Sequence, residues 1–199
     1  MSHSAVQPAF RDPPRDAQDV FRTVMNAMAR PGRILPLRAG FDCPPPLTSA
    51  AAAILIALAD YETPVWLDAM LSNAEAAVEY LRFHTGARLV SAPEQASFAV
   101  IADPVGGPSL STFAQGTPDY PDRSATLIFQ VEHLMCDGWT LAGPGIAGEM
   151  RFGAAPLPAD FAEQLRDNRA RFPLGVDVIF AAPGAVAALP RSTRILEAR

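Results

Sequence analysis

The stretch ATLIFQVEHL at residues 125–134 is rich in apolar, β-branched and aromatic side chains, which predicts a strand. The run WTLAG at 139–143 follows it across the turn-forming triplet CDG at 136–138. We therefore expect the two runs to form an antiparallel hairpin. Because ATLIFQV at 125–131 is mostly apolar, we expect that strand in the core of a sheet rather than at an interface.

Similar patterns predict further elements on both sides of this hairpin. GVDVIFAA and VAALP predict two strands joined by a Pro-Gly turn, and RSTRI continues as strand or tail. Upstream, the Gly- and Pro-rich segment 104–123 predicts a loop with one helical turn near 110–115. The other strands are predicted at 33–38, 63–67, 87–90 and 97–103, and the helices at 16–29, 47–60, 75–85 and 158–172.

Three helix ends carry their own signals. Asp16 is the expected N-cap of the first helix, Ser72 and Glu75 have the spacing of a capping box, and Gly86 can end the helix that follows. Helices interspersed with strands predict an α/β fold, a mixed β-sheet flanked by helices. We expect one α/β domain at 16–199 after an N-terminal extension at 1–15.

The composition excludes several classes of function. The chain has 199 residues, 49% of them hydrophobic, and a net charge of -5, so it has no broad cationic field for nucleic acid or acidic lipid. The longest apolar run, 50–59, is too short to span a bilayer, and the N-terminus lacks a signal-like apolar region. We expect a cytoplasmic protein that binds neither nucleic acid nor membrane.

All sixteen basic residues are arginine, and the sequence contains no lysine. A lysine Schiff base with pyridoxal phosphate cannot form in this chain, and neither can a phosphate loop that depends on lysine. We therefore expect no pyridoxal-phosphate cofactor. Any phosphate group held here must be bound by arginine, backbone N–H groups or a metal ion.

Two segments are candidates for binding an anion. Pro31 and Gly32 suit a type II turn, which places Arg30 and Arg33 at its two ends. Guanidinium groups pair with phosphate or phosphonate oxygens in a two-pronged geometry, but both arginines could instead face water or pair with carboxylates. LAGPGIAG at 141–148 supplies Gly143 and Gly145, whose N–H groups could face an anion or simply form a turn.

The remaining reactive residues give weaker signals. Cys43 and Cys136 belong to no paired motif, which favours idle thiols over a disulfide or a zinc site. The three histidines lack metal-ligand spacing, so no metal centre is predicted, and we expect His84 to cap or pack near a helix end. Asp119 and Asp122 are more typical of a surface turn than of a cation site.

Eight segments in a fixed order, spanning about residues 16–193, resemble the family of H subunits of the bacterial carbon-phosphorus lyase core complex, a system of phosphonate metabolism. They are DAQDVFRTVMNAMARPGRI, LADYETPVWL, LRFHTGARLV, EQASFAV, ATLIFQV, LAGPGI, FPLGVDVIF and LPRSTRI.

The resemblance implies a transferase subunit. With its G, I and L partners it would transfer the ribose 5-triphosphate moiety of ATP to a phosphonate, forming alpha-D-ribose 1-phosphonate 5-triphosphate and releasing adenine; a J subunit belongs to the same assembly. It also implies a fold similar to the large domain of pyridoxal-phosphate-dependent transferases, without the cofactor. ATP and phosphonate would be substrates of the complex, and the resemblance supplies no catalytic residue.

These expectations lead to three hypotheses. The first is a structural or substrate-holding subunit of a multi-protein phosphonate enzyme, not catalytic alone and a homodimer when isolated, since a sheet edge can pair with a second chain. The second is a self-sufficient phosphate-handling enzyme, and the third is a small-ligand-binding homodimer. Arg30 and Arg33 lie within the longest matching segment. They could contact either an anion or the carboxylates of a partner.

Overall fold

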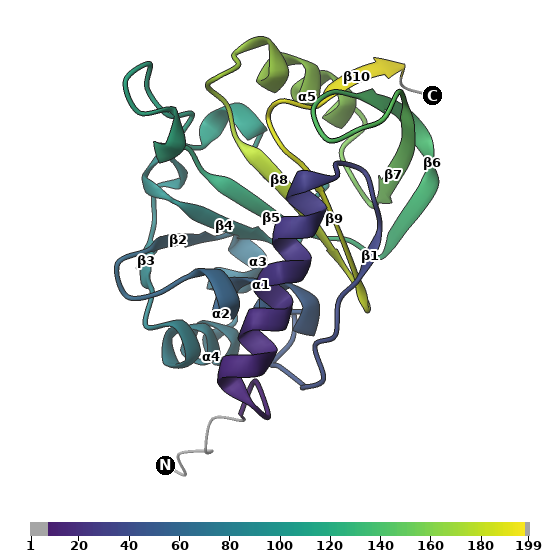
Figure 1. Ribbon diagram of the computed structural model, residues 1–199. Helices are drawn as coiled ribbons and strands as arrows, with labels where there is room; N and C mark the ends of the chain where they lie inside the picture. The colour runs from purple at the N-terminus through teal and green to yellow at the C-terminus, as the bar shows by residue number, and fades with distance from the viewer. Residues whose placement is uncertain (1–7, 198–199) are drawn as a thin grey trace, which may run out of the picture.

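A computed structural model describes residues 8–197 of the chain (Figure 1). A seven-stranded mixed sheet lies between a layer of helices and a second layer made of a three-stranded sheet and one helix. The helices are α1 (Pro13–Ala29), α2 (Ser49–Leu58), α3 (Ala69–Ser72), α4 (Glu75–Thr85) and α5 (Phe161–Ala170). The strands are β1 (Leu35–Pro36), β2 (Pro64–Leu67), β3 (Arg88–Val90), β4 (Phe98–Ile101), β5 (Thr126–Gln130), β6 (His133–Ala142), β7 (Met150–Ala155), β8 (Asp177–Ala182), β9 (Ala185–Leu189) and β10 (Arg194–Glu197).

The large sheet has the strand order β1-β9-β8-β5-β4-β2-β3. Strands β8, β5, β4, β2 and β3 run parallel, and β9 is antiparallel to both of its neighbours. The small sheet has the antiparallel order β10-β6-β7. The predicted fold class, α/β with a mixed sheet flanked by helices, is confirmed, whereas the likeness to pyridoxal-phosphate-dependent transferases stays a prediction.

The helical layer covers one face of the large sheet. In β5 and β8 the side chains alternate, so that Ile128 and Ile179 point into this layer. Helix α1 crosses the sheet and packs on α2 and β9 (Figure 1). The predicted apolar helix 47–60 is confirmed as α2, in which residues 50–55 are buried on every side.

The opposite face carries the aromatic core. Phe129 and Phe180, which alternate with the isoleucines on the same strands, point toward α5 and the small sheet. Phe161 of α5 lies edge-on to Phe129, with ring centroids 5.2 Å apart. The ring centroids of Phe152 in β7 and Phe180 are 5.4 Å apart. The small sheet and α5 therefore pack against the same aromatic cluster.

The predicted hairpin of 125–134 with 139–143 is wrong. Residues 126–130 form β5, a central parallel strand of the large sheet, and the chain then leaves for the small sheet. The CDG triplet does not reverse the chain: it lies inside β6, where the register with β7 shifts between Met135 and Trp139. Strand β6 pairs instead with β7, a strand that the sequence pattern did not predict. Within this pairing the CDG residues form a bulge and not a turn.

Two predicted helix starts are also wrong. Helix α1 begins at Pro13, and the Asp16 carboxylate accepts hydrogen bonds from the backbone N–H groups of Arg11 and Asp12 rather than capping the helix as its first residue. Ser72 ends α3 instead of starting α4, so no capping box forms with Glu75.

Other local predictions are confirmed. Gly86 ends α4 with a φ of 66°, the left-handed conformation that glycine adopts without strain. The predicted helical turn near 110–115 is a short 3-10 helix, Leu110–Thr112, and RSTRI leads into β10, which joins the small sheet. Part of the predicted extension 1–15, residues 1–7, lies outside the described residues. Within the described part of the chain, no helix is long and apolar enough to cross a membrane.

Candidate functional site

The turn that joins α1 to β1 has the predicted form. The backbone N–H of Arg33 donates to the carbonyl of Arg30 at 3.1 Å, and Gly32 has a φ of 77°, as the third position of a type II turn requires. Both arginine side chains are exposed. The Arg30 guanidinium donates to the Oδ1 atom of Asn26 at 3.4 Å, while the Arg33 side chain makes no hydrogen bond or ion pair with the described residues.

The glycine-rich loop forms a second Pro-Gly turn. The N–H of Ile146 donates to the carbonyl of Gly143 at 3.1 Å, and Gly145 has a φ of 82°. A Cβ atom added to Gly145 would overlap the carbonyl oxygen of Ala29 and lie 3.0 Å from the Cδ atom of Pro31. The structure thus brings together the two predicted segments, which are more than 100 residues apart in sequence.

Close packing accounts for glycine at these positions, because a larger side chain would meet neighbouring atoms. A Cβ atom on Gly143 would lie 3.1 Å from the carbonyl oxygen of Ser192. A Cβ atom on Gly32 would lie 2.8 Å from the Cδ1 atom of Leu141, so the arginine turn is seated on the small sheet. The result is a closely packed turn that presents Arg30 and Arg33 to solvent. Anion binding by Arg30, Arg33, Gly143 and Gly145 remains a prediction.

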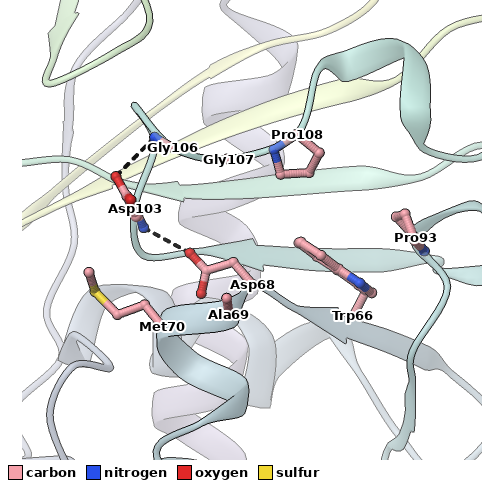
Figure 2. A pocket seen from close by; sticks show the side chains of 9 residues that line it. All are labelled: Trp66, Asp68, Ala69, Met70, Pro93, Asp103, Gly106, Gly107 and Pro108. Atoms are coloured by element: carbon pink, nitrogen blue, oxygen red, sulfur yellow. Dashed lines mark hydrogen bonds between the residues drawn. The ribbon is translucent and has the colours of Figure 1, made fainter.

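A pocket of about 370 Å³ opens elsewhere, at the carboxyl ends of β2 and β4 (Figure 2). From β2 the chain passes through α3 and α4 to β3 on one side, and it then returns to β4 on the other side of β2. Such a reversal of strand order is a topological switch point, where open α/β sheets commonly bind ligands. We call this cavity the switch-point pocket; its lining residues are Trp66, Asp68, Ala69, Met70, Pro93, Asp103, Gly106, Gly107 and Pro108.

Asp68 holds the floor of the pocket together. Its buried carboxylate accepts hydrogen bonds from the N–H of Leu71 at 3.0 Å, the N–H of Ala102 at 2.7 Å and the N–H of Asp103 at 2.8 Å. It therefore caps α3 and at the same time joins the end of β2 to the end of β4. Three charge-assisted hydrogen bonds satisfy this carboxylate, so its role is to position the backbone around it.

Asp103 is the exposed carboxylate of the pocket. Its Oδ1 atom accepts the N–H of Gly106 at 3.1 Å, which shapes the rim (Figure 2). Trp66 is half-buried: its Nε1 atom donates to the carbonyl of Ser91 at 3.3 Å, and its ring lies edge-on to Phe113 at 5.4 Å. The pocket thus combines an aromatic ring and apolar walls with one accessible negative charge.

Sequence reasoning missed this pocket, although a signal was available. The apolar runs VWL and AVIA are each followed directly by aspartate, Asp68 and Asp103. Polar residues at the carboxyl ends of parallel strands gather at one edge of the sheet.

The arginine turn and the switch-point pocket do not form one site. The N–H of Gly32 donates to the carbonyl of Ala188 in β9, and β9 is three strands from β4 in the large sheet, a separation of about 14 Å. Ala188 pairs with Ile179, in the amino half of β8, whereas the pocket lies at the carboxyl edge. The structure therefore offers two independent surfaces.

His84, Cys43 and Cys136 are not among the residues that line the switch-point pocket. His84 packs near the end of α4, with ring centroids 4.4 Å from Tyr80 and 5.0 Å from Phe83. Cys43 and Cys136 are free, and burial followed by the nearby Asp42 charge raises the pKa of Cys43 to about 11. Over residues 8–197, no three histidine, cysteine or acidic side chains are placed to share a metal ion.

Fold and sites together define an α/β protein with a switch-point pocket and a separate exposed arginine turn. Comparison with known proteins then gives its family. Residues 8–196 match the family described as "Bacterial phosphonate metabolism protein (PhnH)", and the chain belongs to this family. This confirms the resemblance drawn from the eight sequence segments.

Two curated relatives cover most of the chain. It is 40% identical over 189 residues to "Alpha-D-ribose 1-methylphosphonate 5-triphosphate synthase subunit PhnH" of Rhizobium meliloti (strain 1021), which covers 94% of both proteins. It is 33% identical over 187 residues to "Putative C-P lyase subunit protein HtxG" of Stutzerimonas stutzeri, which covers 89% of this chain and 85% of that protein.

Proposed function

We propose that this chain is a subunit of a carbon-phosphorus lyase system and works with G, I and L partners in an assembly that also contains a J subunit. The assembly transfers the ribose 5-triphosphate moiety of ATP to a phosphonate and releases adenine. The observation that carries the proposal is the identity of 40% across nearly the full length of a protein named as a subunit of such a synthase. The chain itself contributes a structural or substrate-holding role.

The arginine turn is a candidate contact surface of the chain in this assembly. Two guanidinium groups stand at the ends of a turn whose backbone is fixed by Gly32 and Gly145 against neighbouring segments. A fixed backbone lowers the entropy lost when an anion or a carboxylate of a partner binds. Arg30 and Arg33 therefore offer paired donors to a phosphonate or triphosphate, or to an acidic patch on another subunit.

The first test of the proposal is assembly. Co-expression of this chain with the G, I, J and L subunits, followed by size-exclusion chromatography, should give one large complex that contains the chain. Elution of the chain apart from all four partners would contradict a subunit role and would favour a self-sufficient enzyme.

The second test concerns the arginines. An Arg30→Ala, Arg33→Ala variant should lose either assembly or growth on phosphonate as the phosphorus source. Its control is Arg82→Ala, Arg166→Ala, which also removes two exposed arginines, from α4 and α5. If both double variants assemble and support growth equally, the turn has no contact role.

We also propose that the isolated chain is a homodimer. In the described part of the chain, the edge strands of the large sheet are short, with two residues in β1 and three in β3, whereas the edge strand β7 of the small sheet has six. A long edge strand offers more unpaired backbone groups to a second chain. Light scattering that shows only monomer at micromolar concentration would overturn this proposal.

A further inference from the structure

We propose that the switch-point pocket binds the base of a nucleoside, specifically a planar nitrogen heterocycle with an exocyclic amino group, and that it excludes phosphate. This inference rests on the pocket itself and goes beyond the subunit role proposed above. The charge, the shape and the hydrogen-bonding capacity of the pocket all favour such a ligand.

Charge excludes an anionic ligand. The nine lining residues include two aspartates and no arginine or histidine, and the chain has no lysine. A phosphate or phosphonate group placed here would meet a like charge from Asp103 without a compensating cation. The anions of a phosphonate system must therefore be bound elsewhere, and the separate arginine turn is consistent with that division.

Shape favours a small ring system. A volume of about 370 Å³ is at the lower end of the range for ligand pockets, which suits one fused ring better than a whole nucleotide. Trp66, Met70, Pro93 and Pro108 supply apolar wall. The Trp66 ring is held in place from two sides, by Ser91 and by Phe113, so it needs no reordering before a base packs against it.

Hydrogen bonding selects an amino group. Asp68 is buried and its oxygens already accept three backbone N–H groups, so it is less available to a ligand than the exposed Asp103. Asp103 uses only Oδ1, in its bond to Gly106, and its Oδ2 atom accepts no hydrogen bond from the described residues. A carboxylate oxygen accepts hydrogen bonds and cannot donate them, so it favours the amino group of adenine over the carbonyl oxygen of hypoxanthine.

The two tryptophans make the test specific. They are Trp66, in the pocket, and Trp139, in β6. A Trp139→Phe variant leaves Trp66 as the only tryptophan, and a Trp66→Phe variant leaves Trp139. Titration with adenosine should quench the fluorescence of the first variant in a saturable manner and leave the second unchanged. No saturable change in the Trp66 emission up to about 1 mM adenosine, or the same change in both variants, would overturn the proposal.

Selectivity separates the pocket from a general aromatic surface. Inosine should bind roughly 10-fold more weakly than adenosine, because it presents a carbonyl oxygen to Asp103, and ATP should bind no more tightly than adenosine. Asp103→Asn should abolish the preference for adenosine over inosine, whereas Asp119→Asn, at another exposed aspartate, should preserve it. Tighter binding of ATP, or equal effects of the two variants, would contradict the assignment. These titrations use the isolated full chain, so failure here leaves the subunit proposal to its own co-elution test.

Discussion

Arg191 and Asp177 form a bidentate ion pair that holds the segment before β10 against the first residue of β8. The Nη2 atom of Arg191 lies 2.6 Å from Oδ2 of Asp177, and its Nε atom donates to Oδ1 at 3.2 Å. The Nη1 atom donates to the carbonyl of Pro121 at 2.6 Å. One side chain thus ties together three segments that are distant in sequence.

Loss of this guanidinium should destabilise the fold. Arg191→Ala leaves the Asp177 carboxylate and the Pro121 carbonyl without their partner in a largely buried place, which should lower the free energy of unfolding by about 3 kcal/mol. Urea denaturation followed by circular dichroism measures the change. Arg151→Ala is the control, because it breaks an exposed ion pair with Asp137 and should cost at most about 1 kcal/mol. Equal losses in the two variants would show that burial does not strengthen the Arg191 pair.

The contribution of the contact between the two Pro-Gly turns to stability can be measured by comparing alanine substitutions at two glycines. Gly145→Ala introduces a Cβ atom that overlaps the carbonyl of Ala29, in addition to the strain of a positive φ. Gly148 has a similar φ of 79° but no heavy atom within 4 Å of the added Cβ position, so Gly148→Ala carries the strain alone. Both variants should lose about 1 kcal/mol from backbone strain, and Gly145→Ala should lose clearly more. Equal thermal stability of the two variants would mean that the turns do not rest on each other.

The hydroxyl of Tyr80 is buried without a hydrogen-bond partner among the described residues. Tyr80→Phe removes this unsatisfied group and keeps the ring, so it should leave the free energy of unfolding unchanged or raise it by about 1 kcal/mol. Thermal unfolding near neutral pH checks this expectation. A loss of 2 kcal/mol or more, about the value of a strong hydrogen bond, would reveal a partner for the hydroxyl.

Alkaline pH should destabilise the protein through two groups. Burial, then the charge of Asp42, raises the pKa of Cys43 to about 11 from an ordinary value near 9. Burial, then the charge of Cys43, raises the pKa of Tyr80 to about 12 from 10. Because each folded pKa lies above the unfolded one, the unfolded state loses its proton first. The stability is therefore complete below pH 9 and falls as the pH rises from about 9 through 12.

A double variant tests the cause of this decline. Cys43→Ala combined with Tyr80→Phe should flatten the fall in the free energy of unfolding between pH 9 and 12, as measured by urea denaturation. Cys136→Ala, which removes the exposed cysteine, should leave the decline as it is in the unmodified chain. A decline of the same steepness in the double variant would assign it to other groups.

The two thiols should also differ in reactivity. The thiolate is the reactive form, and at pH 8 the raised pKa of Cys43 leaves little of it, while Cys43 is also half-buried and donates its S–H to the carbonyl of Leu47. Labelling with a disulfide reagent should therefore show a fast phase from exposed Cys136 and a slow phase from Cys43. Cys136→Ser should remove the fast phase, and retention of that phase would contradict the assignment.

The sequence by itself determined the local elements whose signals are short-range. The type II turn at Arg30–Arg33 follows from proline and glycine at its central positions, and the end of α4 follows from Gly86. Apolar runs in the sequence located α2 and the strands β4, β5 and β8. The absence of lysine excluded a Schiff base without any structure.

Only the tertiary structure decided which segments meet. The CDG triplet signals a turn locally, but β7 pairs along β6 and turns it into a bulge, since pairing depends on a strand that lies beyond the glycine-rich loop. Gly145 and Pro31 meet because the small sheet packs on the large one, and Asp68 and Asp103 meet because β2 and β4 are neighbours in the strand order. Local sequence sets the conformation of a segment, whereas long-range packing of apolar faces determines which segments lie next to each other. Both candidate sites of this protein combine segments that are distant in sequence, so only the tertiary structure could reveal them.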